Sequence, residues 1–293
     1  MAPHSEHIVD IIEEIRAFAI ESLGALPKHQ QFHDNIVKEQ NPYGEVHHAR
    51  KLREEHYLPE KAEYVYFIGC TAHYRQTQIR DATLSILKKA GISFTIVDEY
   101  CCSSPLLRTG QTDLAPELAN HNIKEIQATG AKRVVTSCSG CYRTMKRDYS
   151  KMGLDYQFEI LHTAQLLEEL LATRKLSIKT SSETEYAWHD PCHLGRHMNV
   201  YDAPRKVMEI AGVKYLEMEQ NRENAWCCGA GGGARAAFSD WSILTSEKRV
   251  AQAKAIGTKN IVTACPFCIT NLRDASSKES EVVDLVEIID RIT

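Results

Sequence analysis

Apolar and polar residues alternate along most of the chain in a pattern that predicts short strands followed by helices. In the first half, apolar runs predict strands over residues 64–68, 93–97 and 133–137. Apolar residues recur at helical spacing over 77–90 and 114–129, and a glycine that would cap the helix ends each stretch. A further strand and helix are expected over 156–171. Strands alternating with helices of this length are typical of βαβ units with a parallel sheet.

The second half of the chain repeats this order. Strands are expected over residues 186–189, 214–218 and 260–264, and helices over 204–211 and 246–256. The apolar spacing of 282–289 suits one more helix on the sheet, and the polar stretch 175–185 suits an exposed loop. We therefore expect an α/β fold of two pseudo-symmetric, Rossmann-like parallel-sheet units, at 61–172 and 173–293.

Residues 1–60 differ from the rest and are expected to form an N-terminal helical arm. Apolar residues from Ile8 to Phe18 recur at helical spacing, so 6–23 is predicted to be an amphipathic helix. A polar segment over 29–45 contains the turn signal Asn41-Pro42-Tyr43-Gly44. Two interpretations of the arm are open: it packs on its own domain, or it docks another subunit.

Composition narrows the class of protein. The 293 residues are 43% hydrophobic and 25% charged, which is ordinary for a globular protein with one large or two medium domains. A formal net charge of −4 gives no electrostatic basis for binding nucleic acid. No apolar run approaches the roughly 18–20 residues of a membrane span. The first fourteen residues lack the apolar core of a signal peptide. We expect a cytoplasmic protein.

Ten cysteines form two sets of five with the same arrangement. The first set is Cys70, the adjacent pair Cys101-Cys102, and Cys138 with Cys141; the second set is Cys192, the adjacent pair Cys227-Cys228, and Cys265 with Cys268. Cys70 and Cys192 are 122 residues apart, and Cys138 and Cys265 are 127 apart. This near-constant separation indicates a duplicated unit.

The matched spacing favours metal ligands over the other uses of cysteine. Scattered core cysteines would not fall into two equal sets, and thiols in the cytosol stay reduced rather than forming disulfides. Four cysteines satisfy a tetrahedral zinc ion or one cubane cluster. Each set has five, and an adjacent pair can serve two irons more readily than one small ion. The sequence therefore favours iron–sulfur clusters that are not plain cubanes, with zinc in one set as the alternative.

Several motifs around these cysteines resemble the CCG domain of the B-type and D-type subunits of heterodisulfide reductases. The resemblance covers about residues 62–293 and rests on the stretches Phe67–Cys70, Cys101–Gly110, His189–Arg196, Trp226–Gly233 and Ala264–Cys268. One position departs from the family pattern. Ser103 follows the first adjacent pair where the family usually has glycine, and serine does not easily adopt a positive φ.

The resemblance implies a catalytic iron–sulfur subunit of a heterodisulfide-reductase-type complex. Such a subunit would carry two noncubane [4Fe–4S] clusters and cleave or form a disulfide or thiol–sulfur bond in one-electron steps. The alternatives are the B-type subunit of a sulfur-oxidising heterodisulfide-reductase-like complex, or an electron-relay or structural subunit of a lactate- or glycolate-oxidase-type complex. The implied partners are a ferredoxin-like C-type iron–sulfur subunit and a flavin-containing A-type subunit.

Residues beside the cysteines are the other candidates for the site, which we expect between the two clusters. Arg108 and Arg235 follow the two adjacent pairs at similar positions and would hold an anionic substrate or balance cluster charge; solvated surface arginines are the alternative. Three histidines near strand ends would donate a proton to a departing thiolate, or be ordinary hydrogen-bonded residues: His162, His189 and His193. Backbone amides at Gly229, Gly231 and Gly232 would approach the cluster sulfides.

Overall fold

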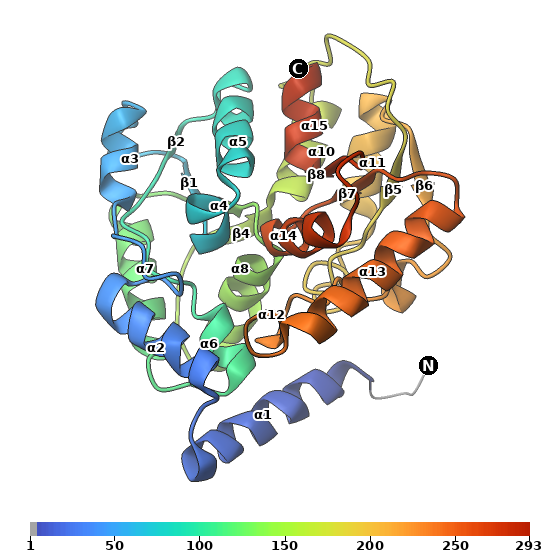
Figure 1. Ribbon diagram of the computed structural model, residues 1–293. Helices are drawn as coiled ribbons and strands as arrows, with labels where there is room; N and C mark the ends of the chain where they lie inside the picture. The colour runs from blue at the N-terminus through green and yellow to red at the C-terminus, as the bar shows by residue number, and fades with distance from the viewer. Residues whose placement is uncertain (1–4) are drawn as a thin grey trace.

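The computed structural model describes residues 5–293, without the side chains of residues 5–7, 49 and 50. Two α/β units lie side by side (Figure 1). The first has a parallel sheet in the order β2-β1-β3-β4, built from β1 (Tyr64–Tyr66), β2 (Phe94–Thr95), β3 (Arg133–Thr136) and β4 (Glu159–His162). The second has the matching order β6-β5-β7-β8, from β5 (Tyr186–Trp188), β6 (Tyr215–Glu217), β7 (Ile261–Thr263) and β8 (Val282–Asp284). The predicted α/β fold with a repeated parallel sheet is confirmed.

Longer helices flank each sheet, and most of them match the predicted ranges. They are α5 (Thr77–Lys89), α7 (Ala115–Ala128) and α10 (Thr163–Ala172) in the first unit, and α11 (Asp202–Ala211), α13 (Ser239–Ala255) and α15 (Leu285–Ile292) in the second. The apolar pattern did not predict six further helices: α4 (Cys70–Tyr74), α6 (Ser104–Thr109), α8 (Ser139–Arg143), α9 (Tyr149–Lys151), α12 (Ala234–Ala237) and α14 (Pro266–Ala275). A π-helical turn (Thr144–Asp148) links α8 to α9, and a 3₁₀ turn lies at Arg222–Asn224.

The prediction of one helix over 282–289 is wrong, because the segment is a strand followed by a helix. Asp284 ends β8, and its carboxylate accepts a hydrogen bond from the amide of Val286 while Glu287 accepts one from the amide of Asp284. This reciprocal cap starts α15 at Leu285. His162 and Gln165 start α10 in the same way after β4, so the two units match here as well.

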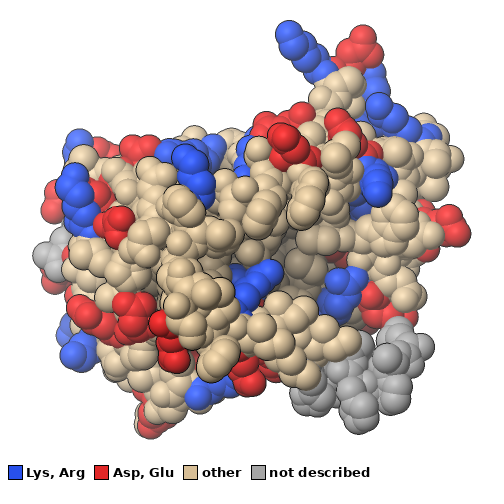
Figure 2. All heavy atoms as spheres, turned by 60° about the horizontal axis from the view of Figure 1, so that its bottom comes forward, with Lys and Arg blue, Asp and Glu red and all other residues tan. Residues whose placement is uncertain are grey.

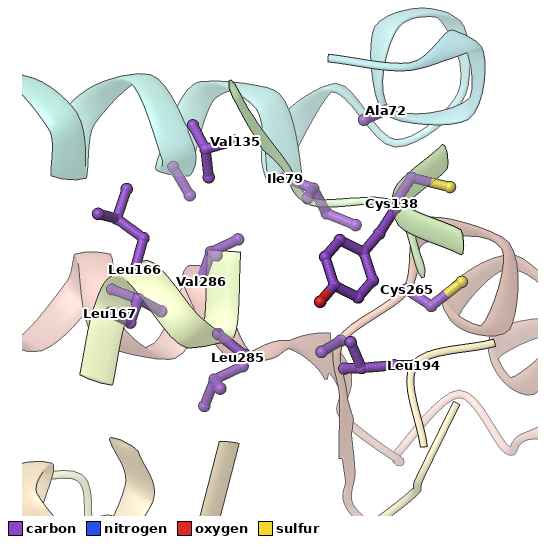
Figure 3. Packing of buried hydrophobic residues seen from close by; sticks show 14 of the residues in the cluster. Ala72, Ile79, Val135, Cys138, Leu166, Leu167, Leu194, Cys265, Leu285 and Val286 are labelled. Carbon is purple, nitrogen blue, oxygen red and sulfur yellow. The ribbon is translucent and has the colours of Figure 1, made fainter. Parts of the chain in front are cut away.

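A helix of each unit packs on a helix of the other unit, and the two contacts are related by an approximate twofold axis. Helix α10 of the first unit packs on α11 of the second, and α15 of the second packs on α5 of the first. Leu166, Leu167, Leu285 and Val286 meet in this shared core (Figure 3). Cys138 and Cys265 lie at one edge of the same core, with their sulfur atoms pointing the same way, out of the apolar packing.

The N-terminal segment contributes three helices, α1 (Ser5–Leu23), α2 (Pro27–Glu39) and α3 (Ala49–Glu55). Helix α2, which the sequence pattern does not predict, reaches the core because Ile36 packs with Cys101 and Leu106. Helix α1 runs beneath the two units and contacts α6 (Figure 1). None of the helices formed by residues 5–293 has the length and apolar character needed to cross a bilayer.

Helix α1 is turned so that Asp10 and Glu13 face the protein. Glu13 Oε1 lies 3.0 Å from Arg143 Nη1, and Asp10 Oδ2 lies 2.6 Å from Arg147 Nη2. Its apolar residues face outward instead: Ile15 is 60% exposed and Phe18 is 72% exposed. The predicted amphipathic helix is therefore present, but its apolar face is not buried on its own domain.

Candidate metal centre

The ten cysteine thiols form a continuous series of neighbours that runs through both units. In the first unit the contacts link Cys70, Cys101, Cys102, Cys141 and Cys138 in that order. In the second unit they link Cys192, Cys227, Cys228, Cys268 and Cys265 in the equivalent order. The two series meet where the Cys138 thiol contacts that of Cys265. All ten cysteines are free of disulfides.

A cavity of about 330 Å³ lies between the units, and nine of the ten cysteines line it. Cys70 follows β1, Cys138 follows β3, Cys192 follows β5 and Cys265 follows β7, so the carboxyl ends of the inner strands of both sheets face this space. Phe32, Pro42 and Tyr43 of the N-terminal segment also line it. The two cysteine sets therefore open onto one shared cavity.

Crowding and burial set the chemistry of these thiols. Hydrogen bonds with Cys102 and Cys138, together with burial, raise the pKa of Cys141 well above its usual range. Cys228 and Cys265 act in the same way, with burial, on the pKa of Cys268. A bound metal compensates the negative charge of converging thiolates and displaces their protons. Five converging thiols in each unit therefore fit an iron–sulfur cluster, and they exceed the four that tetrahedral zinc uses.

Backbone geometry brings the chain close to these sulfur atoms. Gly69 has a φ of 77°, and a Cβ there would lie 2.8 Å from Cys141 Sγ. Gly229 has a φ of 85°, and its amide donates to Cys227 Sγ at 3.3 Å. Ser103 has a φ of 74°, so the turn after the first adjacent pair keeps the left-handed conformation that glycine would adopt more easily. The serine at this position therefore still permits the turn that a glycine would make.

The three glycines singled out in the sequence have different surroundings. Gly231 and Gly232 line the cavity, whereas a Cβ at Gly229 would clash with the carbonyl oxygen of Ser242. Gly229 thus lets its loop pass close to α13. Of the three glycines, it is the one whose amide donates a hydrogen bond to a cysteine sulfur. Contact between these glycines and a cluster stays a prediction.

Arg108 and Arg235 both line the cavity, and both are paired with carboxylates. The Arg108 guanidinium is buried; its Nε lies 3.1 Å from Glu13 Oε1 and its Nη2 pairs with Asp148. Arg235 Nη1 donates to Asn271 Oδ1 at 2.5 Å, and its Nη2 pairs with Asp274. Their proposed binding of an anionic substrate stays a prediction, and these pairs show that each arginine is already positioned by neighbouring side chains.

His162 and His193 occupy different environments. His193 lines the cavity, its ring lies 4.8 Å from that of His197, and burial lowers its pKa well below the usual range. His162 is fully buried outside the cavity lining, and its Nδ1 accepts the amide hydrogen of Ala164 at 3.2 Å. Burial lowers the pKa of His162 to about 4. Proton donation by either histidine stays a prediction, and of these two the structure brings only His193 to the cavity.

His189, the third histidine near a strand end, forms a buried pair with Arg249. Arg249 Nε donates to His189 Nδ1 at 3.0 Å. A ring nitrogen of His189, Cys228 Sγ and Cys268 Sγ lie within 4.8 Å of one another. The sequence indicates His189 through its place at the end of a predicted strand. Arg249 was missed because it lies inside a predicted helix, where nothing in the sequence distinguishes it from a surface arginine.

Known proteins share the duplicated cysteine pattern of this chain. The cysteine-rich domain family CCG matches the chain twice, over residues 64–146 and 186–273. The chain is 38% identical over 294 residues to the D-type subunit of the dihydromethanophenazine:CoB–CoM heterodisulfide reductase of Methanosarcina barkeri, covering 96% of this chain and 72% of that protein. It is 30% identical to the probable iron–sulfur-binding oxidoreductase FadF of Bacillus subtilis, covering 97% of this chain and 43% of that protein.

A solved structure shares the arrangement of both units. A hypothetical protein from Helicobacter pylori superposes with a TM-score of 0.67 at 11% sequence identity, covering 97% of this chain and 57% of that one. At this identity the likeness concerns the fold alone.

Proposed function

The chain belongs to the cysteine-rich CCG domain family and is an oxidoreductase of the heterodisulfide reductase type, and we propose that it is the catalytic iron–sulfur subunit of such a complex. The observation that carries the proposal is the unbroken series of ten thiols. It runs from one unit to the other through the contact between Cys138 and Cys265, which we call the seam. With one cluster bound at each set, two one-electron carriers would lie next to each other. A substrate disulfide held beside them could receive one electron from each.

Each set of five cysteines would hold one noncubane [4Fe–4S] cluster. The first would be held by Cys70, Cys101, Cys102, Cys138 and Cys141, and the second by Cys192, Cys227, Cys228, Cys265 and Cys268. Such clusters supply one-electron transfer and iron sites that accept sulfur. The adjacent cysteine pair in each set allows one thiolate more than a cubane needs.

The reaction class is reduction of a disulfide to two thiols, or its reverse. The sulfur–sulfur bond breaks, two electrons arrive from a partner iron–sulfur subunit, and two protons end on the two thiolates. Apolar side chains from Phe32, Pro105 and Phe267 line the cavity beside the cysteines. Arg108 and Arg235 stand on opposite units beside the cavity and would orient an anionic substituent of the substrate.

A relay role without substrate is the second candidate. It is favoured by the pairing of both cavity arginines with carboxylates, which lowers their capacity to hold an anionic substrate. In that role the chain would pass single electrons between partner subunits through the same ten-thiol seam.

We expect anaerobically purified protein to contain about four irons and four sulfides for each cysteine set, by analogy with known clusters. Iron, sulfide and zinc would be measured per chain, with an electron paramagnetic resonance spectrum recorded before and after adding thiol. A spectrum that changes with thiol supports sulfur chemistry at the irons, and one that does not supports the relay. One zinc and iron for a single cluster would refute the symmetric assignment.

The exposed apolar face of α1 supports docking of a separate ferredoxin-like iron–sulfur subunit, with a flavin-containing A-type subunit further along the electron path. The face consists of Ile8, Ile11, Ile12, Ile15 and Phe18. In Figure 2, which brings this side of the molecule forward, uncharged side chains cover much of the front. The charged face of α1 is already used against Arg143 and Arg147, which leaves the apolar face to a partner.

Replacing Ile15 and Phe18 together with serine is expected to weaken binding of that subunit at least about a hundredfold, because each apolar side chain that becomes buried contributes about 1.5–3 kcal/mol. Co-purification and titration of the partner would measure the loss. Ile210→Ser is the matched control, since Ile210 is a half-exposed apolar residue on α11. Unchanged binding in the double variant, with iron content intact, would place the partner elsewhere.

A further inference from the structure

The two cysteine sets have the same arrangement but different neighbours. His189 stands three residues before Cys192, and Phe67 stands three residues before Cys70. Both side chains are buried, at 1% and 0% exposure. The duplicated fold therefore places an apolar ring beside the first set and an imidazole beside the second.

The hydrogen bond to Arg249 determines which nitrogen of His189 carries the proton. A guanidinium has only donors, so His189 Nδ1 must accept the bond from Arg249 Nε at 3.0 Å. The proton of the neutral ring then lies on Nε2. This nitrogen is buried and has no hydrogen-bond partner among the protein atoms described. It is an N–H donor that still requires an acceptor.

Sulfur atoms are the nearby acceptors, because a ring nitrogen of His189, Cys228 Sγ and Cys268 Sγ lie within 4.8 Å of one another. Ligation of iron by His189 would need a lone pair on Nε2 and a proton on Nδ1. Histidines that bind metals usually donate that second N–H to an acceptor, which Arg249 cannot be. The arrangement therefore suits a hydrogen bond from His189 to cluster sulfur rather than a sixth ligand.

Arg249 supplies a buried positive charge behind this ring. It is fully buried, and its Nη1 donates to Gln220 O at 2.7 Å and to Gln252 Oε1 at 2.6 Å. These acceptors are neutral, and its Nη2 is buried without a partner in the described protein. The carboxylates in its vicinity, Asp190 and Glu217, are paired with Arg205.

The first set has no equivalent surplus of positive charge in its described surroundings. Its buried arginines, Arg108 and Arg143, are paired with carboxylates of Glu13 and Asp148. Glu99 also lies beside it, where its carboxyl oxygens accept the amide hydrogens of Ile68 and Gly69 at 2.8 Å each, and it adds no positive charge. An added electron is therefore better stabilised at the second set.

We propose that His189, held by Arg249, donates a hydrogen bond from Nε2 to sulfur of the cluster at the second cysteine set, and that this cluster has the higher reduction potential of the two. His189 is a positioning and tuning residue in this scheme. The inference rests on the proposed function, because it requires a cluster at each set. It gives electron transfer through the seam a direction, from the first set to the second.

The test is a potentiometric titration of the whole protein followed by electron paramagnetic resonance. Wild-type protein should show two separate one-electron steps. His189→Phe, which reproduces the residue of the first unit, should lower the upper step by about 59 mV or more, a tenfold change in a one-electron equilibrium. The lower step should not move. His121→Phe is the control, since His121 Nε2 contacts Asp98 O at 2.7 Å rather than a cysteine.

A second measurement on wild-type protein keeps the proposal testable if His189→Phe does not fold. Pulsed resonance on the reduced protein should detect an exchangeable proton close to the cluster and no strongly coupled nitrogen. A strongly coupled nitrogen would make His189 a ligand and overturn the hydrogen bond. Coincident steps in wild-type protein would overturn the asymmetry while leaving the proposed function standing, whereas absence of iron would remove the proposed function itself.

Discussion

Replacing Arg205 with methionine is expected to destabilise the protein by about 3–5 kcal/mol, the usual effect of removing one member of a buried ion pair. Arg205 Nη1 lies 2.8 Å from Asp190 Oδ1, and its Nη2 lies 2.9 Å from Asp190 Oδ2. The two side chains are 5% and 2% exposed. Methionine would fill the space but leave the buried carboxylate without its cation. Chemical denaturation would measure the change in free energy of unfolding.

Burial opposes ionisation of Asp190, but hydrogen bonds from Arg205, Trp188 and the amide of Arg222 hold its pKa below the usual range. A depressed carboxyl pKa stabilises the fold above the unfolded pKa of about 3.9, and this contribution is lost as the pH falls through the folded value. The difference between wild type and Arg205→Met should therefore shrink in strong acid. Lys206→Met, on the exposed face of the same helix, is the control and should change little. A small loss in Arg205→Met at neutral pH would mean that Trp188 and Arg222 suffice to hold the carboxylate.

Replacing Cys265 with serine is expected to remove the cluster of the second set while leaving the fold and the first set intact. Cys265 is the N-cap residue of α14, and serine is also a favourable N-cap, so the helix should still form. A serine hydroxyl is a much poorer ligand for iron than a thiolate. Loss of a residue that only hydrogen-bonds to a metal ligand lowers metal affinity roughly 10–100-fold, and loss of the ligand Cys265 itself should lower it further. Iron content should drop to about half, and turnover by the complex should be lost.

Ser139→Ala is the matched control, because Ser139 lies next to Cys138 at the same seam and its Oγ donates to Ala264 O at 2.7 Å. It removes a hydrogen bond between the units but no thiol, so iron content should stay at the wild-type level. Full iron content in Cys265→Ser would mean that four thiolates suffice for the second set. A noncubane cluster using all five would then be excluded there.

Much of the α/β architecture could be predicted because the strands are short, apolar and bounded by glycine, as at Gly91 and Gly130. The β8–α15 segment was missed because Val282 and Val283 are both buried and give no two-residue period. The equivalent segment ending at Leu171 is predicted as a strand and then a helix. The internal repeat itself could therefore have corrected the second unit.

The cysteine sets were visible in the sequence because their spacing repeats, whereas contacts made across the chain were not. Nothing in the spacing of Glu13 and Arg143 indicates that they pair across 130 residues. Arg108 and Arg235 stand out by position alone, and their carboxylate partners come from other elements. Likewise, the sequence left open whether the apolar face of α1 packs on its own domain or docks another subunit, and it did not show the ion pairs of Asp10 and Glu13 that turn this face to the outside.

The repeated strand order has a consequence for how such a protein can evolve. Two identical subunits related by a twofold axis must place the same residue beside both of their sites, so neither site can be tuned without tuning the other. Joining the halves in one polypeptide removes that constraint. Phe67 and His189 occupy equivalent places in the two halves yet differ in polarity. Duplication followed by fusion thus allows selection to change the residues beside one electron carrier without changing those beside the other.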